Sequence, residues 1–357
     1  MTESFSVYLE IIRVFATLLV FIGHTSSLYT PLSDIRPGIG RQGVIFFFVL
    51  SGYVISWCAN EKESELRQFI TNRAARIYSV ALPAIILSFT VSLILYLANR
   101  SDFPYQLKRL WNYLPIYLSF TGDFWTLSET PPNDFPYWSL DYEVWYYVMF
   151  GLFFYLKARW RIYLTIFIAL VIGPYITSMF PLWLFGSFIY FKGKNLRISK
   201  ITAKLLFFVS TISYLYIAIS NTDIHINDYN IFLNIHIIHW TPKYFLGDYV
   251  VGLLVVINFI SASKIEFIIK KQLSFLIKKI ASYSFSCYLF HIPILALVST
   301  FIGKSDSIIV FIMEIFVIIF SVIFFAKFTE HKKALYRSFI NNVFAKIKYA
   351  FSSNGNQ

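Results

Sequence analysis

Charged side chains are scarce in this chain of 357 residues: Asp, Glu, Lys and Arg make up only 14%, where a soluble domain carries about 25%. Hydrophobic residues make up 57% of the chain, and aromatic residues alone make up 20%. The two cysteines, Cys58 and Cys287, lie in or beside apolar segments and form neither a disulfide framework nor a metal-binding pattern. These shortages exclude an ordinary soluble domain and a disulfide-stapled secreted fold, and indicate a polytopic membrane protein.

Acidic residues are also scarce, 19 against 31 basic ones, which gives a formal net charge of +12. The placement of the basic residues explains this charge better than nucleic-acid binding does. A secretory leader is not expected, because the first residues, MTESFS, have no basic region and the apolar run Ser6–Tyr29 is longer than a leader's core.

Apolar runs separated by turn and charge signals predict about ten membrane spans. They lie at residues 7–29, 42–60, 77–99, 138–156, 162–177, 178–191, 203–219, 244–262, 283–303 and 307–326. With the N-terminus in the cytoplasm, the cytoplasmic loops and tail contain 23 Lys and Arg and the outer loops contain 7, as the positive-inside rule requires. We therefore expect an all-α bundle with both termini inside, made of a membrane domain (1–330) and a basic, frayed tail (331–357).

Two short stretches depart from this regular pattern. Residues 162–177 and 178–191 share about 30 positions, interrupted by Gly173, Pro174 and Pro181, where two full crossings need about 40. These spans are expected to be short and broken, or one of them re-entrant. The stretch from Lys264 to Ile280 alternates Lys with Ile, Phe and Leu, which predicts an interfacial amphipathic helix.

One stripe of ionisable residues runs through the first predicted span. An ionisable group at membrane depth costs roughly 2.5–3.5 kcal/mol, so such groups usually face a polar interior. Arg13 and His24 are close to three helical turns apart, on one face and about 16 Å from each other along the axis. Glu10 lies one turn before Arg13 and can pair with it. The stripe predicts the edge of an intramembrane active site, although a structural ion pair and a packed histidine would also account for it.

A carboxylate is expected at the level of His24. His24 lies about five residues from the outer end of its span, and Glu143 lies about five residues inside the fourth span. A neutral imidazole oriented by a carboxylate can take a proton from a hydroxyl, which is general-base chemistry. The two residues are therefore predicted to act together in the outer part of the membrane.

Arginines mark the inner end of the same region. Arg73 and Arg76 are three residues apart on one helical face, level with Arg13. Three converging guanidiniums suit a phosphorylated ligand. Arg73 and Arg76 could instead serve only as positively charged anchors that fix the membrane topology. The spacing His236-x-x-His239 could indicate a metal, but no third ligand is obvious nearby and no metal site is expected.

Five segments occur in order between Tyr8 and Pro293. They are the Glu10–Arg13–His24 pattern, RQGVIFFFVLSGYVI (41–55), NRAARIY with its two arginines, WSLDYEVWYY (138–147) and SFSCYLFHIPI (284–294). In this order they resemble the motifs of acyltransferase family 3, a family of integral membrane acyltransferases that act on cell-surface glycans and related molecules. The departures are mild: Glu10 replaces an Asp, Ser79 a Pro, Phe285 a Tyr, and Val144 a second Glu.

The resemblance implies roles for the residues of these motifs. His24 would be the catalytic base, and Glu143 would assist it. Arg13 would be the essential partner of His24 in the first span, and Arg73 and Arg76 would lie near the phosphates of acyl-coenzyme A, the donor substrate, which Arg13 is also expected to bind from its place beside them. The remaining candidates would line the site, among them Glu10, Ser51, Trp138, Tyr147 and His291. Ser51 and Tyr147 are also candidates, by motif alone, for stabilising the oxyanion.

The resemblance, together with these residues, implies a membrane O-acyltransferase that moves an acyl group, first of all acetyl, from cytoplasmic acyl-coenzyme A to a hydroxyl of a cell-surface or lipid-linked glycan. We expect the lipid bilayer and the glycan acceptor as its partners, in a bacterial inner membrane. Two alternatives stay open: a transporter that passes acyl groups to a separate extracytoplasmic transferase, and a proton-coupled glycan or lipid exporter. The exporter accounts for the buried charges but not for five ordered motifs.

Overall fold

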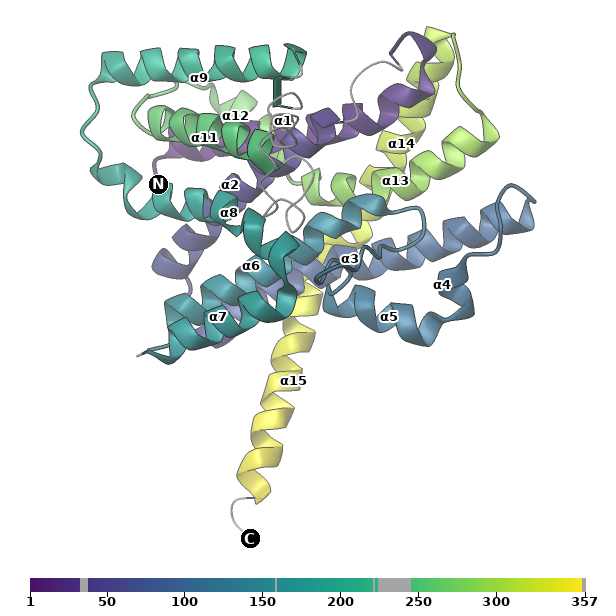
Figure 1. The fold of residues 1–357 in the computed structure, drawn as a ribbon, viewed down its shortest axis with the longest axis horizontal. Coiled ribbons are helices and arrows are strands. Elements are labelled where there is room, and N and C mark those ends of the chain that lie inside the picture. The colour runs from purple at the N-terminus through teal and green to yellow at the C-terminus, as the bar shows by residue number, and fades with distance from the viewer. Residues whose placement is uncertain (33–37, 158, 221, 224–244, 355–357) are drawn as a thin grey trace, which may run out of the picture.

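A computed structural model describes residues 1–32, 38–157, 159–220, 222–223 and 245–354 of the chain (Figure 1). Regular structure in these ranges is helical, and none of these residues forms a strand. The all-α class expected from the sequence is therefore confirmed. Seven helical stretches are long and apolar enough to cross a membrane, namely Glu3–Leu28, Gly38–Glu61, Leu66–Leu97, Lys200–Ser220, Phe245–Ala262, Ser284–Phe301 and Ile308–Lys346.

Each of the ten predicted spans coincides with a helix. These helices are α1 (Glu3–Thr25), α2 (Gly38–Glu61), α3 (Leu66–Leu97), α6 (Trp138–Tyr155), α7 (Trp160–Ile172), α8 (Pro174–Phe191), α9 (Lys200–Ser220), α11 (Phe245–Ala262), α13 (Ser284–Phe301) and α14 (Ile308–Phe328). Shorter or peripheral elements are α4 (Tyr105–Lys108), α5 (Leu110–Ser119), α12 (Lys271–Ala281), α15 (Lys333–Asn354) and the 3-10 turns η1 (Ser26–Leu28), η2 (Thr30–Leu32), η3 (Phe135–Tyr137), η4 (Gly193–Asn195) and η6 (Glu330–Lys332).

Helix α2 lies at the centre of the bundle and packs closely on α8 and α1. A Cβ placed on Gly52 would lie 1.9 Å from the Trp183 carbonyl oxygen, and one on Gly186 would lie 1.9 Å from that of Val49. Such close backbone contact needs small residues, as is usual between membrane helices. Gly52 of α2 and Gly186 of α8 therefore allow the backbones of these two helices to touch.

Helix α3 begins earlier than the predicted span. It starts at Leu66 and runs for 32 residues, about 48 Å, so Arg73 and Arg76 lie inside the helix and not in a loop. The apolar run stops at charged residues, but the stretch from Leu66 to Arg76 contains neither Gly nor Pro, so nothing in it breaks a helix. The tail that was expected to fray is also helical: α15 packs on α3 and then extends away from the other helices (Figure 1).

The predicted break between the fifth and sixth spans is confirmed. Helix α7 has 13 residues, about 20 Å, which is shorter than a hydrocarbon core of about 30 Å. Gly173 separates it from α8 with a φ of +86°, a conformation that favours glycine. A Cβ at this position would also lie 2.8 Å from the backbone nitrogen of Trp125, so only glycine fits here without strain.

Backbone contacts define the two ends of the bundle. At one end, which we call the basic end, the Phe267 N–H donates to Ser4 Oγ (2.8 Å) beside α12, and the Ser286 N–H donates to the Glu330 carboxylate (3.0 Å). Of the stretch Lys264–Ile280, predicted as one amphipathic helix, only the second part is helical, as α12, and residues 266–270 are not. At the opposite end, the Ser305 N–H donates to the Leu28 carbonyl oxygen (2.9 Å). Helix α1 connects these two ends.

Candidate active site

Two histidines form a pair near the end of α1 that is opposite the basic end. Nδ1 of His24 lies 2.8 Å from Nε2 of His291 on α13, and the rings stack with centroids 5.1 Å apart. Nδ1 of His291 lies 2.7 Å from the carbonyl oxygen of Cys287. A carbonyl only accepts, so His291 carries its proton on Nδ1 and, when neutral, offers a bare Nε2 to the N–H of His24. The chain of bonds leaves Nε2 of His24 with a free lone pair, as a base requires.

The surroundings of His24 leave space at this nitrogen. A Cβ placed on Gly40 of α2 would lie 3.5 Å from Nε2 and 3.5 Å from Cα of Val20, ordinary contact distances, so the glycine leaves room for a methyl group there. On another side, the half-exposed Phe135 ring meets the imidazole edge-on at 4.9 Å between centroids. Nε2 therefore faces a small gap between α2 and the turn that precedes α6.

A cavity of about 550 Å³ extends from the basic end toward this pair. Its wall on α2 runs from Ile55 to Val44, about 16 Å along the helix. Val44 lies one turn from Gly40 toward the basic end, and Gly40 lies beside His24. On α13, Tyr288 of the wall likewise lies one turn from His291 toward the basic end. The cavity therefore ends about one helical turn short of the histidine pair, on the side of the basic end.

The cavity is rich in cationic groups. Arg13 lines it and forms the predicted ion pair with Glu10, 2.5 Å between nitrogen and oxygen. Arg76 also lines it, with its guanidinium carbon 5.8 Å from the centre of the Phe285 ring. At the basic end, Lys278 of α12 and Lys333 of α15 complete the wall. These four cations face three carboxylates, Glu10, Glu143 and Glu330.

Arg73 has a different environment from Arg76. Its Nη2 lies 2.5 Å from the carboxylate of Glu63, which is 4% exposed and also accepts a bond from Asn72 (2.6 Å). Arg73 is not among the described residues that line the cavity. Of the three arginines expected to converge, Arg13 and Arg76 line one cavity, whereas Arg73 is held by a carboxylate ten residues earlier.

Glu143 does not pair with His24 in the described structure, contrary to the expectation from depth. Its carboxylate accepts hydrogen bonds from Ser51 Oγ (3.2 Å) and from the Tyr147 hydroxyl, in the middle of the cavity wall. The reason is the entry into α6: Phe135, not Glu143, lies level with His24, and Glu143 follows eight residues later, about 12 Å deeper. The side chain that contacts His24 is that of His291, where a carboxylate had been expected.

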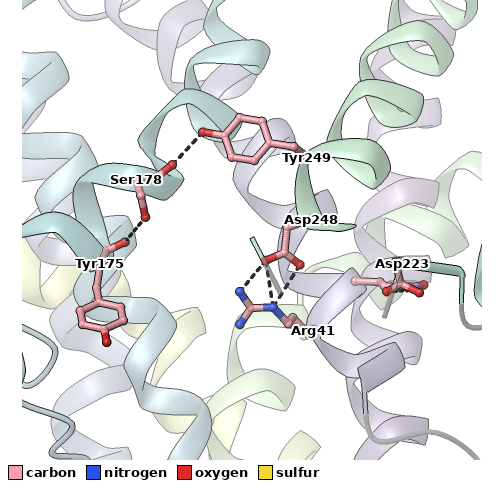
Figure 2. Close-up of polar contacts among 7 residues, drawn as sticks. Arg41, Tyr175, Ser178, Asp223, Asp248 and Tyr249 are labelled. Atoms are coloured by element: carbon pink, nitrogen blue, oxygen red, sulfur yellow. Dashed lines mark hydrogen bonds and ion pairs between the residues drawn. The ribbon is translucent and has the colours of Figure 1, made fainter. Parts of the chain in front are cut away.

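The end of the cavity nearest the histidine pair contains two hydroxyl groups that the sequence did not single out. Ser139 Oγ and the Tyr288 hydroxyl lie 2.6 Å apart. Next to them, the predicted site residue Trp138 lies under the Arg41 guanidinium, 5.7 Å from guanidinium carbon to ring centre. Arg41 in turn forms a bidentate ion pair with Asp248 of α11: its Nε donates to Oδ1 (3.0 Å) and its Nη2 donates to Oδ2 (2.5 Å) (Figure 2). This cluster ties α2, α6 and α11 together beside the site.

Several lining residues were missed at the sequence level. Lys278 and Lys333 were read only as topology signals, and Glu330 lies in a segment that we had treated as the end of the membrane domain. Their position is set by α12 and η6 folding back against α1 and α13, which no local pattern reveals. The pair His236 and His239 lies outside the described residues.

The apolar helices and the charged cavity between them are those of a multi-pass integral membrane protein. A family model described as an acyltransferase domain matches residues 6–327, nearly the whole chain. The protein therefore belongs to acyltransferase family 3, and the membrane acyltransferase class predicted from five motifs is confirmed. No curated protein and no solved structure matches the chain.

Proposed function

We propose that the protein transfers an acyl group, first of all acetyl, from cytoplasmic acyl-coenzyme A to a hydroxyl of a cell-surface or lipid-linked glycan in a bacterial inner membrane. The observation that carries this proposal is the cavity that begins among cations at the basic end and stops one turn below a histidine with a free Nε2. A long donor with a charged head and a reactive tip fits such a site.

The cations explain why a phosphorylated donor would bind here. Arg13 and Arg76 present guanidiniums inside the cavity, and Lys278 and Lys333 add charge at the basic end. Guanidiniums bind phosphate oxygens in bidentate fashion, and the low dielectric of the bundle strengthens each contact. Arg13 lies eleven residues before His24, so the phosphates and the reacting carbonyl would be separated by about 16 Å, a span that a thin acyl-bearing arm can bridge.

The reaction needs only the groups already described. The acceptor oxygen attacks the thioester carbonyl carbon while its proton moves to Nε2 of His24. The carbon–sulfur bond of the tetrahedral intermediate then breaks, and the imidazolium returns the proton to the thiolate. The products are the acyl ester and the coenzyme A thiol, so protons and electrons balance. The Nδ1–H of His24 remains bonded to His291 throughout, which holds the ring in place.

The test follows two labels. Purified wild type and His24→Ala in lipid vesicles receive acetyl-coenzyme A labelled in the acetyl group or, separately, in the coenzyme, together with lipid-linked glycans. We expect the acetyl label alone to appear in the glycan with wild type, and a decrease of at least about 10²-fold with His24→Ala at equal protein level. Equal transfer by both proteins would remove His24 from the mechanism. Acetyl label that crosses the membrane without entering any glycan would favour the transporter.

A further inference from the structure

A second hollow lies on the other side of α1 from the donor cavity. It measures about 340 Å³ and lies between α1, α2, α9 and α11, with Phe267 at one end. Glu10 and Arg13 face the donor cavity, whereas Tyr8, Ile11 and Phe15 of the same helix face this hollow, which we call the α1–α9 groove. The two sites are thus separated by the thickness of one helix.

The wall of the α1–α9 groove is apolar. Its few polar groups bond to one another: the Asn258 amide donates to Ser210 (3.1 Å) and Thr211 (3.0 Å), and its oxygen accepts from the Tyr8 hydroxyl. Polar groups that satisfy one another offer little to water or to a sugar, and apolar hollows of this kind stay dry. The chemistry of the wall therefore suits a hydrocarbon chain.

The direction of the groove matches that of a lipid chain. Near the basic end its wall is made by Tyr8 and Phe267, whose rings stack at 5.6 Å. From there it runs to Phe15 on α1, about 10 Å along the helix, and from Phe207 to Leu215 on α9, about 12 Å. Ile11 and Leu215 at its rim are 39% and 46% exposed, so the groove opens sideways toward the surrounding bilayer.

Positive charge lies at the end of the groove where a headgroup would be. Residues 264–279, which include Phe267, contain five Lys and one Glu. Lys270 and Lys271 are exposed and follow Phe267 by three and four residues, where a non-helical segment leads into α12. Helices α1, α9, α11 and α12 lie on the same side of the bundle in Figure 1. An apolar channel with a basic mouth complements a molecule with one negative head and a hydrocarbon tail.

We propose that the α1–α9 groove binds one chain of an anionic phospholipid, drawn from the leaflet at the basic end, with its phosphate on Lys270 and Lys271. Nothing in the proposed acyl transfer requires this site, so the two proposals stand independently. A bound chain would pack against Ile11 and Ile12, on the reverse side of the turn that carries Arg13. The lipid would thus be part of the wall that positions the donor cavity.

The experiment counts retained lipids by native mass spectrometry on the purified full-length protein, titrated with phosphatidylglycerol or phosphatidylcholine. Wild type should retain one phosphatidylglycerol with an affinity at least about tenfold above that for phosphatidylcholine. Ile11→Trp should fill the groove and lower retention of both lipids, and Leu215→Trp provides a second filling variant on another helix. Leu18→Trp is the matched control, because Leu18 is also exposed on α1 (49%, against 39% for Ile11) but does not line the groove, and it should bind as wild type does.

The headgroup is tested separately. Lys270→Gln with Lys271→Gln should abolish the preference for phosphatidylglycerol and leave phosphatidylcholine retention unchanged. The exposed pair Lys157 and Arg159, changed to Gln, should keep the preference. Equal binding of the two lipids by wild type, or unchanged binding by both groove-filling variants, would overturn the proposal. A preference for a polyprenyl phosphate over phosphatidylglycerol would overturn it as well, because the occupant would then be a carrier of the acceptor.

Discussion

Nδ1 of His24 and Nε2 of His291 lie 2.8 Å apart, although 267 residues separate them in the chain. The bond is directional because His291 donates its other N–H to the Cys287 carbonyl oxygen. His24 must then donate to His291, and its Nε2 is left to accept a proton. The second histidine thus does for the first what a carboxylate does in many hydrolytic sites, without adding a charge to the membrane interior.

The bond between the two histidines predicts that His291→Ala changes turnover much more than the Michaelis constant for the donor. Turnover should fall by roughly 10²-fold, because the His24 ring loses the partner that sets its tautomer, whereas the Michaelis constant for acyl-coenzyme A should change little. Steady-state rates over a range of donor concentrations separate the two parameters. His291→Gln, whose amide oxygen can accept the same bond, should recover part of the rate. Unchanged turnover in His291→Ala would show that another group orients His24.

Gly40 predicts a steric effect at the same nitrogen. A methyl group at this position would lie 3.5 Å from both Nε2 of His24 and Cα of Val20, ordinary contact distances, so Gly40→Ala should fold normally. A branched side chain extends further into the gap that the acceptor hydroxyl must enter. We expect Gly40→Val to lower turnover by roughly tenfold or more relative to Gly40→Ala, at equal thermal stability.

Equal turnover of the Gly40→Val and Gly40→Ala variants would mean that the acceptor approaches His24 from another direction. Thermal unfolding of both proteins in the same detergent provides the control. A lower unfolding temperature for Gly40→Val alone would make its rate uninformative, and Gly40→Ser, with a side chain of intermediate size, would then replace it.

Local sequence patterns were enough to predict the helices, but not which side chains contact one another between helices. The ten apolar runs coincide with helices, and the spacing of Glu10 and Arg13 predicted an ion pair that the structure contains, because both follow from one helix period. The depth of Glu143 was wrong because the chain enters α6 through a buried turn, so a count of residues from the start of the span misplaces it. The position of His291 against His24 depends on how α13 packs on α1, which is a property of the whole bundle.

The two arginines of α3, Arg73 and Arg76, should have different effects when they are changed one at a time. Arg76 lines the donor cavity, so Arg76→Gln should raise the Michaelis constant for acyl-coenzyme A by roughly 10- to 100-fold, the range for a lost charge-assisted bond. Arg73→Gln leaves the buried Glu63 carboxylate without its cation and should destabilise the fold by roughly 3 kcal/mol. Donor kinetics and thermal unfolding, measured on both variants, test this division.

The double change Glu63→Gln with Arg73→Gln is the matched control for the second effect. It removes the ion pair without leaving a buried charge, and should recover much of the lost stability. A raised Michaelis constant that persists in this double variant would show that Arg73 contacts the donor after all, as the sequence had suggested.

Asp123 predicts how stability changes with pH. It lies in the connection between α5 and α6, where its N–H donates to Asp141 (3.1 Å), and burial raises the pKa of its carboxyl from 3.8 to about 6, although a hydrogen bond with Tyr142 opposes the shift. Between pH 4 and 6 the folded state therefore binds more protons than the unfolded state, so this group's contribution to stability falls as pH rises and is lost above about pH 6.

Asp123→Asn should raise the free energy of unfolding at pH 8 by roughly 1–3 kcal/mol and leave it nearly unchanged at pH 4. Asp102→Asn, at an exposed position before α4, should change neither value. Thermal unfolding of the three proteins at both pH values measures the difference, and a wild type that gains stability from pH 4 to 6 as strongly as Asp123→Asn does would contradict the assignment.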